Sequence, residues 1–278
     1  MSVERRAGGL TLIEVLVVVG VMAVLVSVLL PALASARGAA RLVIGASNAR
    51  QLALANTAYA GDSDGRYVAG SPGIGGENLV RWHGVRESDG EAFDARGGAL
   101  TPYLDGRSSS GGVRACPVFA DRLEELRMVE DGGFEVGCGG YGYNNAFVGS
   151  SPSRRFVGGD VVWEYGVRAR ERGSRLSDFA RPMETVGFAD AAIAHSAVVE
   201  YSFVEPRFWP QYAQAFRPDP SVHFRQIGGR ANVAWLDGRV SQEVRTKTHW
   251  SGVYPLDSAS VGIGWFGGAD SNGLFDYE

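Results

Sequence analysis

Residues 9–36 read GLTLIEVLVVVGVMAVLVSVLLPALASA, and this stretch decides the fold of the chain. After Glu14, the 22 residues from Val15 to Ala36 carry no charged side chain. An α-helix rises about 1.5 Å per residue, so the run covers roughly 33 Å, whereas the hydrocarbon core of a bilayer is about 30 Å thick. A helix also satisfies its own backbone hydrogen bonds, as lipid requires. The sequence therefore predicts one membrane-spanning helix at about residues 12–34.

Glu14 is the one charged residue in this stretch. A carboxylate in a membrane segment costs about 2.5–3.5 kcal/mol at the bilayer centre and less near the interface, so it needs a partner. Cleavage between Gly9 and Leu10 would place a new α-amino group one helical turn from Glu14. In a bundle of identical helices, the amine of one subunit would neutralise the carboxylate of its neighbour. Glu14 is therefore predicted to act in assembly.

Residues 9–14, GLTLIE, resemble the processing site of type IV pilins and type II secretion pseudopilins. In that family, a prepilin peptidase cuts after the glycine and methylates the new N-terminus, which implies cleavage between Gly9 and Leu10. The family carries a glutamate at the fifth mature position, where this chain has Glu14, and often a proline in the helix, where it has Pro31. Leu10 departs from the usual phenylalanine but is also apolar.

The resemblance implies three regions: a prepilin leader of residues 1–9, an N-terminal helix of residues 10–60, and a globular head domain of residues 61–278. It also implies a single-pass protein of the bacterial inner membrane with a periplasmic head, which reaches the cell surface when assembled. Charge alone leaves the topology open, because arginines flank the apolar run on both sides.

Two other interpretations of the N-terminus stay open. An ordinary signal peptide also has a basic start, an apolar core and a small-residue cleavage site, and Ala34-Ser35-Ala36 has that form. Its core is about 7–15 residues long, shorter than the run found here, and Glu14 would interrupt it. The third interpretation is a membrane anchor unrelated to pilins.

The expected fold class is α+β, with the long helix packed on a mainly antiparallel β-sheet head. Small residues recur at helical spacing up to Ala53, which suits close packing, and Gly61 is expected to end the helix. Asp237-Gly238 between two alternating runs predicts a hairpin with a type I′ turn. Further strands are expected near residues 66–68, 79–83, 141–148, 156–165, 185–189 and 197–204, and short helices near 100–104, 121–130 and 174–180.

Residues 228–240 resemble the closing motif of a large pilin-like subfamily, in which a histidine is followed by nine residues and Asp-Gly. Ile227 occupies the histidine position in this chain. His223 stands four residues too early to fill that position directly. What the histidine does in relatives is therefore not transferable to this sequence.

Charge and cysteine content limit the chemistry of the head. Residues 61–278 hold 22 of the 27 basic and 29 of the 31 acidic residues, a net charge of −7, which disfavours nucleic acid as a partner. Cys116 and Cys138 both follow the membrane segment, and a disulfide between them is permitted if the head is periplasmic. Such a bond would stabilise the head by about 3 kcal/mol. The alternative is two separate buried thiols.

Metal and catalytic signals are weak. The Asp-rich segments 62–65 and 270–276 offer oxygen ligands to a structural calcium ion, which major pseudopilins hold in a C-terminal loop, but both also fit ordinary turns. No other metal ligand is assigned, and no cofactor is expected. Asp190, His195 and Ser196 are neighbours in sequence, a placement that does not make a catalytic triad. The chain is not expected to be an enzyme.

The interpretation that follows is a structural subunit of a type II secretion pseudopilus or a type IV pilus-like filament. Its expected partners are the prepilin peptidase, copies of itself, other pilin-like subunits, the secretion or pilus assembly machinery, and inner-membrane lipid. The alternative is a minor pilin-like tip or surface-binding protein whose head recognises a partner.

Overall fold

The computed structural model describes residues 11–104, 115–119, 135–158, 160–212 and 214–277. The chain divides into two compact units, Met1–Arg41 and Leu42–Glu278. Gly9 and Leu10 therefore lie outside the described residues, as does the short helix expected at residues 121–130. The second unit begins within the long helix, because the last turns of that helix pack with the head.

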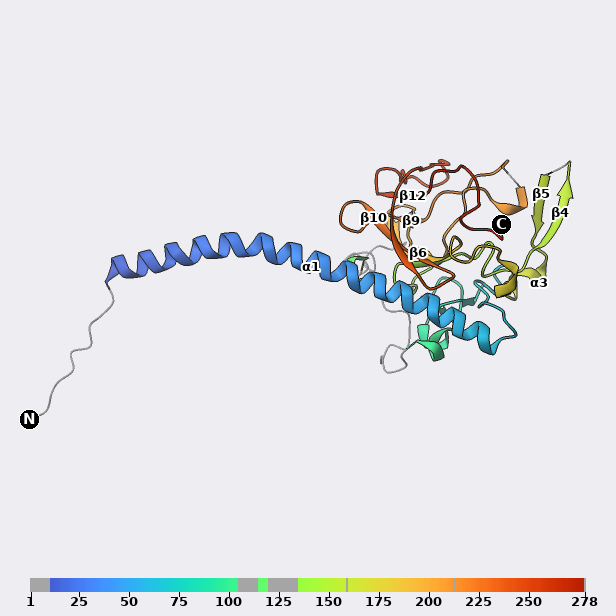
Figure 1. Ribbon diagram of the computed structural model, residues 1–278, viewed down its shortest axis with the longest axis horizontal. Helices are drawn as coiled ribbons and strands as arrows, with labels where there is room; N and C mark the ends of the chain where they lie inside the picture. The colour runs from blue at the N-terminus through green and yellow to red at the C-terminus, as the bar shows by residue number, and fades with distance from the viewer. Residues whose placement is uncertain (1–10, 105–114, 120–134, 159, 213, 278) are drawn as a thin grey trace, which may run out of the picture. The chain divides into compact units, whose positions relative to one another are not determined.

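The long helix α1 runs over Leu12–Asp62 and includes Pro31 (Figure 1). Its end differs from the expectation that Gly61 would terminate it, since Gly61 is still helical. The backbone turns at Asp64 and Gly65, with φ of 54° and 71°, and the Gly65 N–H donates to the Ala60 carbonyl at 2.9 Å. This six-to-one hydrogen bond closes the helix as in a Schellman motif, where glycine accepts the left-handed conformation without strain.

In the first unit, α1 presents apolar side chains in every direction. Exposed fractions are 67% for Leu16, 58% for Leu25 and 60% for Leu30. Among the described residues, α1 is the one helix long and apolar enough to cross a membrane, judged by length and composition. The predicted apolar span is therefore present as a continuous helix.

In the second unit, α1 buries one face against the head. The buried residues are mostly small or polar: Gly45, Asn48, Ala49, Leu52, Ala53, Ala55, Asn56 and Ala60. A Cβ added at Gly45 would lie 3.2 Å from the amide nitrogen of Asn232, and the Tyr141 hydroxyl donates to the Gly45 carbonyl at 3.3 Å. Small residues thus let the helix approach the strands closely, as the sequence pattern predicts.

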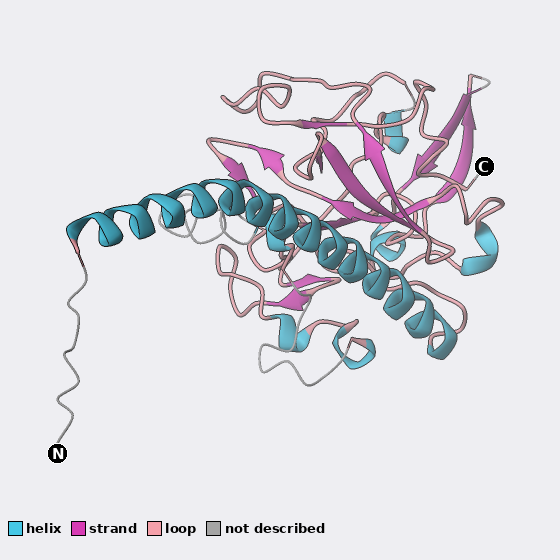
Figure 2. Cartoon of the chain, turned by 60° about the vertical axis from the view of Figure 1, so that its left-hand side comes forward, coloured by secondary structure: helices cyan, strands magenta, loops and turns pink. Residues whose placement is uncertain are grey.

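The head is built around a four-stranded sheet of order β11-β10-β6-β3 (Figure 2). Its strands are β3 Tyr141–Tyr143, β6 Val186–Asp190, β10 Arg230–Trp235 and β11 Val240–Val244, and all three pairings are antiparallel. Phe188 lies opposite Tyr143 on one side and Ala234 on the other. The antiparallel sheet and the long helix together give the α+β layout that the sequence predicts.

Four two-stranded antiparallel sheets complete the described strands. They pair β1 Val80–Arg81 with β2 Gly84–Val85, β4 Ser153–Val157 with β5 Asp160–Glu164, β7 Ile193–Ala194 with β8 Val198–Val199, and β9 Val222–His223 with β12 Ile263–Gly264. The single strand expected at 156–165 is instead a hairpin, because Gly158 takes a positive φ of 62° and reverses the chain.

Short helical turns connect the strands. They are η1 Ala95–Gly97, η2 Thr101–Tyr103, α3 Val167–Arg170, η3 Leu176–Asp178 and η4 Pro210–Tyr212. The helices expected near residues 100–104 and 174–180 are thus single 3₁₀ turns. The strand expected at 66–68 is reduced to one bridge between Arg66 and Arg175.

The Asp237-Gly238 hairpin is confirmed, but its turn is not type I′. Trp235 and Arg239 pair across the loop, and the Gly238 N–H donates to the Trp235 carbonyl at 2.9 Å. Gly238 has φ of 84°, whereas Asp237 is not among the residues of positive φ, which type I′ requires at both central positions. The loop is therefore a three-residue turn with the left-handed glycine last.

An aromatic core lies under the sheet. The rings of Tyr143 and Phe188 stack with centroids 4.7 Å apart, and Trp82 meets Phe188 edge-on at 5.1 Å. All three side chains are fully buried. Aromatic pairs of this geometry contribute about 0.5–1.5 kcal/mol each beyond their buried area, so they fix the sheet to the loops that surround it.

Candidate functional site

Glu14 caps the start of α1. Its carboxylate accepts hydrogen bonds from the backbone N–H of Thr11 at 2.7 Å and from the Thr11 hydroxyl at 2.9 Å. The Glu14 N–H points back to the Thr11 hydroxyl at 3.3 Å. This reciprocal pattern is a capping box, which satisfies backbone donors that have no partner within the helix. In the isolated chain, Glu14 therefore has a local hydrogen-bonding role.

The capping box was missed in the sequence, although its signal is there. Thr11 followed three residues later by Glu14, directly before an apolar run, is the usual pattern of a capped helix N-terminus. The assembly role predicted for Glu14 and the processing predicted at Gly9 and Leu10 stay predictions. Thr11 belongs to the site together with Glu14, because its N–H and its hydroxyl both donate to the Glu14 carboxylate.

The closing motif places Ile227 at the surface and His223 inside. Ile227 is 57% exposed in the tight turn that joins Gln226 to Arg230. His223, on β9, is 3% exposed, and its Nδ1 lies 3.2 Å from an Arg225 nitrogen. His223 therefore does not move into the position of the missing histidine.

The buried carboxylate of Asp190 is bound by polar residues in and next to that motif. Asp190, at the end of β6, accepts from the backbone N–H of Asn232 and from the Gln226 amide, both at 2.8 Å, and forms an ion pair with Arg225 at 3.2 Å. Asp190 is fully buried, so each of these donors offsets the cost of removing its charge from water. Asp190 has a structural role here, and it forms no triad with His195.

Cys116 and Cys138 are both buried free thiols in the structure. The Cys116 N–H donates to the Gly139 carbonyl at 2.8 Å, so the two segments run side by side. Each sulfur has its own neighbour: the Gln226 amide lies 3.8 Å from Cys116 Sγ, and Glu200 lies 3.7 Å from Cys138 Sγ. The structure thus has the arrangement of the alternative, two buried free thiols, and the disulfide stays a prediction.

Two carboxylates of the Asp-rich segments, Asp64 and Asp270, are held in ion pairs. Asp64 contacts Arg175 at 2.5 Å. Asp270 lies between Arg217 at 3.0 Å and Lys247 at 2.8 Å, and the hydrogen bonds from these two residues hold the pKa of Asp270 well below its ordinary value. Across the described residues, no group of three or more His, Cys, Asp or Glu side chains could hold a metal ion.

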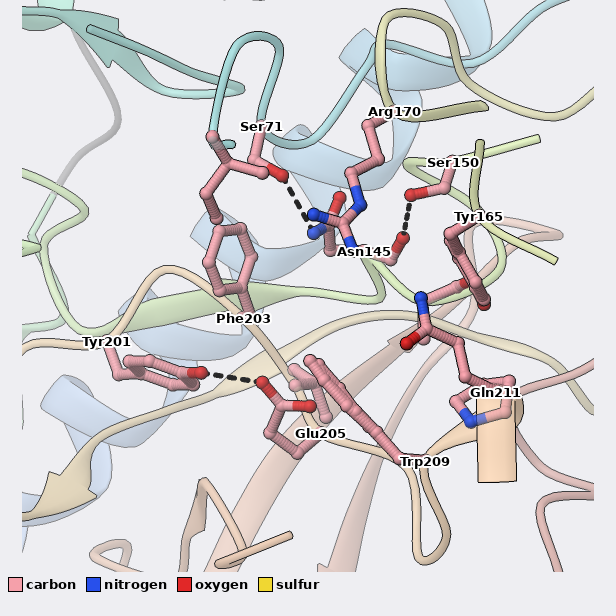
Figure 3. Close-up of a pocket in the computed structure, with 14 residues that line it drawn as sticks. Ser71, Asn145, Ser150, Tyr165, Arg170, Tyr201, Phe203, Glu205, Trp209 and Gln211 are labelled. Atoms are coloured by element: carbon pink, nitrogen blue, oxygen red, sulfur yellow. Dashed lines mark hydrogen bonds between the residues drawn. The ribbon is translucent and has the colours of Figure 1, made fainter. Parts of the chain in front are cut away.

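A cavity of about 130 Å³ lies in the head, and no local sequence pattern predicts it (Figure 3). Its lining comes from four separate stretches of the chain: residues 71–74, 145–150, 165–170 and 201–211. The charged residues in it are Glu205 and Arg170, and the aromatic ones are Tyr165, Tyr201, Phe203 and Trp209. This cavity is a candidate binding site, because it brings two charged side chains together with four aromatic ones.

Comparison with known proteins identifies no relative: the chain matches no protein-family model, no curated protein and no solved structure. A functional proposal therefore depends on the residues of this chain and on the resemblance of residues 9–14.

Proposed function

We propose that the chain is a structural subunit of a type II secretion pseudopilus or a type IV pilus-like filament. A prepilin peptidase cleaves it between Gly9 and Leu10 and methylates the new N-terminus. Its partners are copies of itself, other pilin-like subunits, the assembly machinery and inner-membrane lipid. In this proposal the subunit is not an enzyme.

The exposed apolar surface of the first unit carries this proposal. From Leu12 to Leu33, the large apolar side chains of α1 are about half exposed or more, with 80% for Leu12 and 49% for Leu33. A contiguous run of exposed apolar side chains marks contact with a membrane or with another protein. Lipid covers it before assembly in the proposed cycle, and the helices of neighbouring subunits cover it afterwards.

Glu14 sets the axial register between neighbouring helices in the proposed filament. The capping box uses one oxygen, Oε2, for both contacts with Thr11. A carboxylate has two oxygens and about four acceptor positions, so Glu14 can keep its cap and accept from the α-amino group of a neighbouring subunit. Apolar contacts alone tolerate sliding between helices, whereas a charge pair favours one axial position.

A binding subunit at the filament tip is the second candidate, and one observation favours it. The cavity around Glu205 and Arg170 offers charged and aromatic groups to a ligand, which a purely structural head does not need. The two candidates share the anchor and its processing, and they differ in whether the head binds a molecule outside the filament.

Processing and filament fractionation test the proposal together. The protein is extracted from cells that carry an active assembly machine, and its intact mass is measured in the membrane and in sheared filaments. The expected mass is that of a chain starting at methylated Leu10, present in both fractions. A start at Arg37 would identify a cleaved signal peptide, and a processed chain confined to the membrane would rule out a filament subunit.

A further inference from the structure

The cavity of the head combines aromatic walls with two charged groups. Arg170 comes from α3, whereas Glu205 follows the segment that carries Tyr201 and Phe203, and Figure 3 shows the two charged side chains separated across the group of lining residues. Its volume of about 130 Å³ is well above the roughly 10–15 Å³ that holds one water. The cavity therefore has room for a ligand of several non-hydrogen atoms.

Glu205 has no cationic partner among the described residues. The Tyr201 hydroxyl donates to its Oε1 at 2.6 Å, which leaves the second oxygen, Oε2, without a hydrogen bond in that part of the chain. Burial raises the pKa of Glu205 to about 7, because the ionised carboxylate is poorly solvated there. A cation placed beside Glu205 would stabilise its ionised form.

Arg170 is likewise without an ion-pair partner in the described structure. Arg170 is one of four arginines between residues 168 and 175, and two of the others differ from it: Arg168 is exposed, and Arg175 pairs with Asp64. Tyr165 is close to both charges of the cavity. Burial raises the pKa of Tyr165 most, and the charges of Arg170 and Glu205 act on it in opposite directions. One cavity thus holds a cation and a carboxylate that have no ion-pair partner among the described residues.

We propose that this cavity binds a small organic zwitterion, whose ammonium group lies at Glu205 among the aromatic rings and whose carboxylate lies at Arg170. An ammonium group is attracted to aromatic faces as well as to a carboxylate. A guanidinium binds a carboxylate through two parallel hydrogen bonds. Trp209 adds a buried indole N–H that has no acceptor among the described residues. This inference goes beyond the proposed filament role and does not depend on assembly.

Alternative ligands fit the cavity less well. A purely anionic ligand would meet Arg170 but would place its charge near Glu205, and a purely cationic one would have the reverse problem. A neutral apolar ligand would leave both charges unpaired in a poorly solvated site, which is costly. The zwitterion is the one class that neutralises both groups at once.

The test uses isothermal titration calorimetry on the full-length chain in detergent micelles. The probes are ω-amino acids of increasing length: glycine, β-alanine, 4-aminobutyrate, 5-aminopentanoate and 6-aminohexanoate. At least one is expected to bind saturably at one site per chain, and the preferred length reports the separation of the two charged groups. The analogue with the same carbon chain but lacking the carboxylate, and the one lacking the amine, are each expected to bind at least tenfold more weakly.

Variants assign the two ends of the ligand. Glu205→Gln keeps the side-chain size and an acceptor for Tyr201, and it is expected to weaken binding of the preferred probe at least tenfold. Arg170→Gln is expected to do the same, whereas Arg168→Gln, the matched control on the same helical turn, leaves binding unchanged.

Three results would overturn the inference. They are no saturable binding of any ω-amino acid, a single-charge analogue that binds as tightly as the zwitterion, or unchanged binding in Glu205→Gln and Arg170→Gln. The analogue series is measured on the unaltered protein, so it decides the question even if a variant fails to fold.

Discussion

The two parts of α1 share one backbone conformation and have opposite surroundings. In the first unit, Leu25 is 58% exposed, whereas in the second unit Leu52 is 1% exposed. The first part is rich in valine and leucine, and the buried face of the second is mostly alanine, glycine and asparagine. The more apolar part of a helix is therefore not always the more buried one: the first part leaves its apolar side chains exposed, and the second packs one face against the head.

Truncating one leucine in each part sharpens this comparison most. Leu52→Ala is expected to destabilise the head by about 2–5 kcal/mol, because it leaves a cavity in a packed core. Leu25→Ala shortens a side chain that is 58% exposed and is expected to leave head stability within about 0.5 kcal/mol. Denaturant unfolding of the full-length chain in detergent, followed by tryptophan fluorescence, measures both. Equal losses would contradict the division of α1.

The next comparison is between two carboxylates, Glu205 in the second unit and Glu14 at the start of α1 in the first. Burial raises the pKa of Glu205 to about 7, above its unfolded value of 4.5, so the folded head holds this proton more tightly than the unfolded chain does. The tighter proton binding stabilises the folded head. This stabilisation is complete below about pH 4.5 and is lost as the pH rises through 7, which lowers the free energy of unfolding by up to about 3 kcal/mol. Head stability is therefore expected to fall between pH 5 and 8.

Glu205→Gln tests that pH dependence. The variant is expected to flatten the loss of unfolding free energy between pH 5 and 8, whereas Glu14→Gln in the first unit keeps the profile of the unaltered protein. A profile that stays the same in Glu205→Gln would mean that another group titrates in this range.

Polar residues of α1 provide a third comparison. The Asn56 amide donates to the Tyr143 hydroxyl and accepts from the Val68 N–H, both at 3.0 Å, in a buried site. Asn56→Leu is expected to cost about 1–3 kcal/mol, since it leaves these groups unsatisfied. Ser27 bonds only to the Val24 carbonyl within its own helix, so Ser27→Ala should not change head stability. The same denaturant titration measures both variants.

The smallest expected effect is at the capping box. Thr11→Ala removes the side-chain contacts with Glu14 and is expected to weaken the first turn of α1 by about 1 kcal/mol. Hydrogen exchange at the backbone amides of residues 12–15 should accelerate by up to about tenfold, while the amides of residues 45–56 keep their protection. Unchanged exchange in the first turn would show that the cap contributes nothing there.

Sequence patterns predicted the features that depend on neighbours along the chain. The 51 residues of α1 and the β10–β11 hairpin follow from apolar runs and from one Asp-Gly pair. The type of that turn was not predictable, because the position of the left-handed residue depends on the register that the strands adopt. The alternating pattern of residues 156–165 predicts one strand, whereas the left-handed Gly158 reverses the chain and divides β4 from β5.

The cavity could not be predicted from sequence in the same way. Arg170 and Glu205 are 35 positions apart, and neither belongs to a local motif. Arg170 stands in a stretch of arginines that is typical of a solvated surface, and only the fold distinguishes it from Arg168. Buried polar groups such as Asp190 are likewise defined by partners that the sheet brings together, whereas the Thr11–Glu14 cap was readable and was missed.

In the proposed filament, the charge of Glu14 directs assembly, and substitutions at Glu14 and Thr11 separate this charge from the cap. Glu14→Gln removes the charge but can keep the cap, because glutamine also serves at this position of a capping box. Thr11→Ala removes the side-chain cap but keeps the carboxylate. In both variants, processing between Gly9 and Leu10 is read from the intact mass.

The most direct measurement is the amount of each variant in sheared filaments, relative to the membrane, in cells with an active assembly machine. The expected result is that Glu14→Gln is processed normally and inserted in the membrane but largely absent from filaments, while Thr11→Ala enters them at close to the level of the unaltered protein. The reverse pattern, with Glu14→Gln in filaments and Thr11→Ala excluded, would contradict the claim and assign assembly to the helix cap.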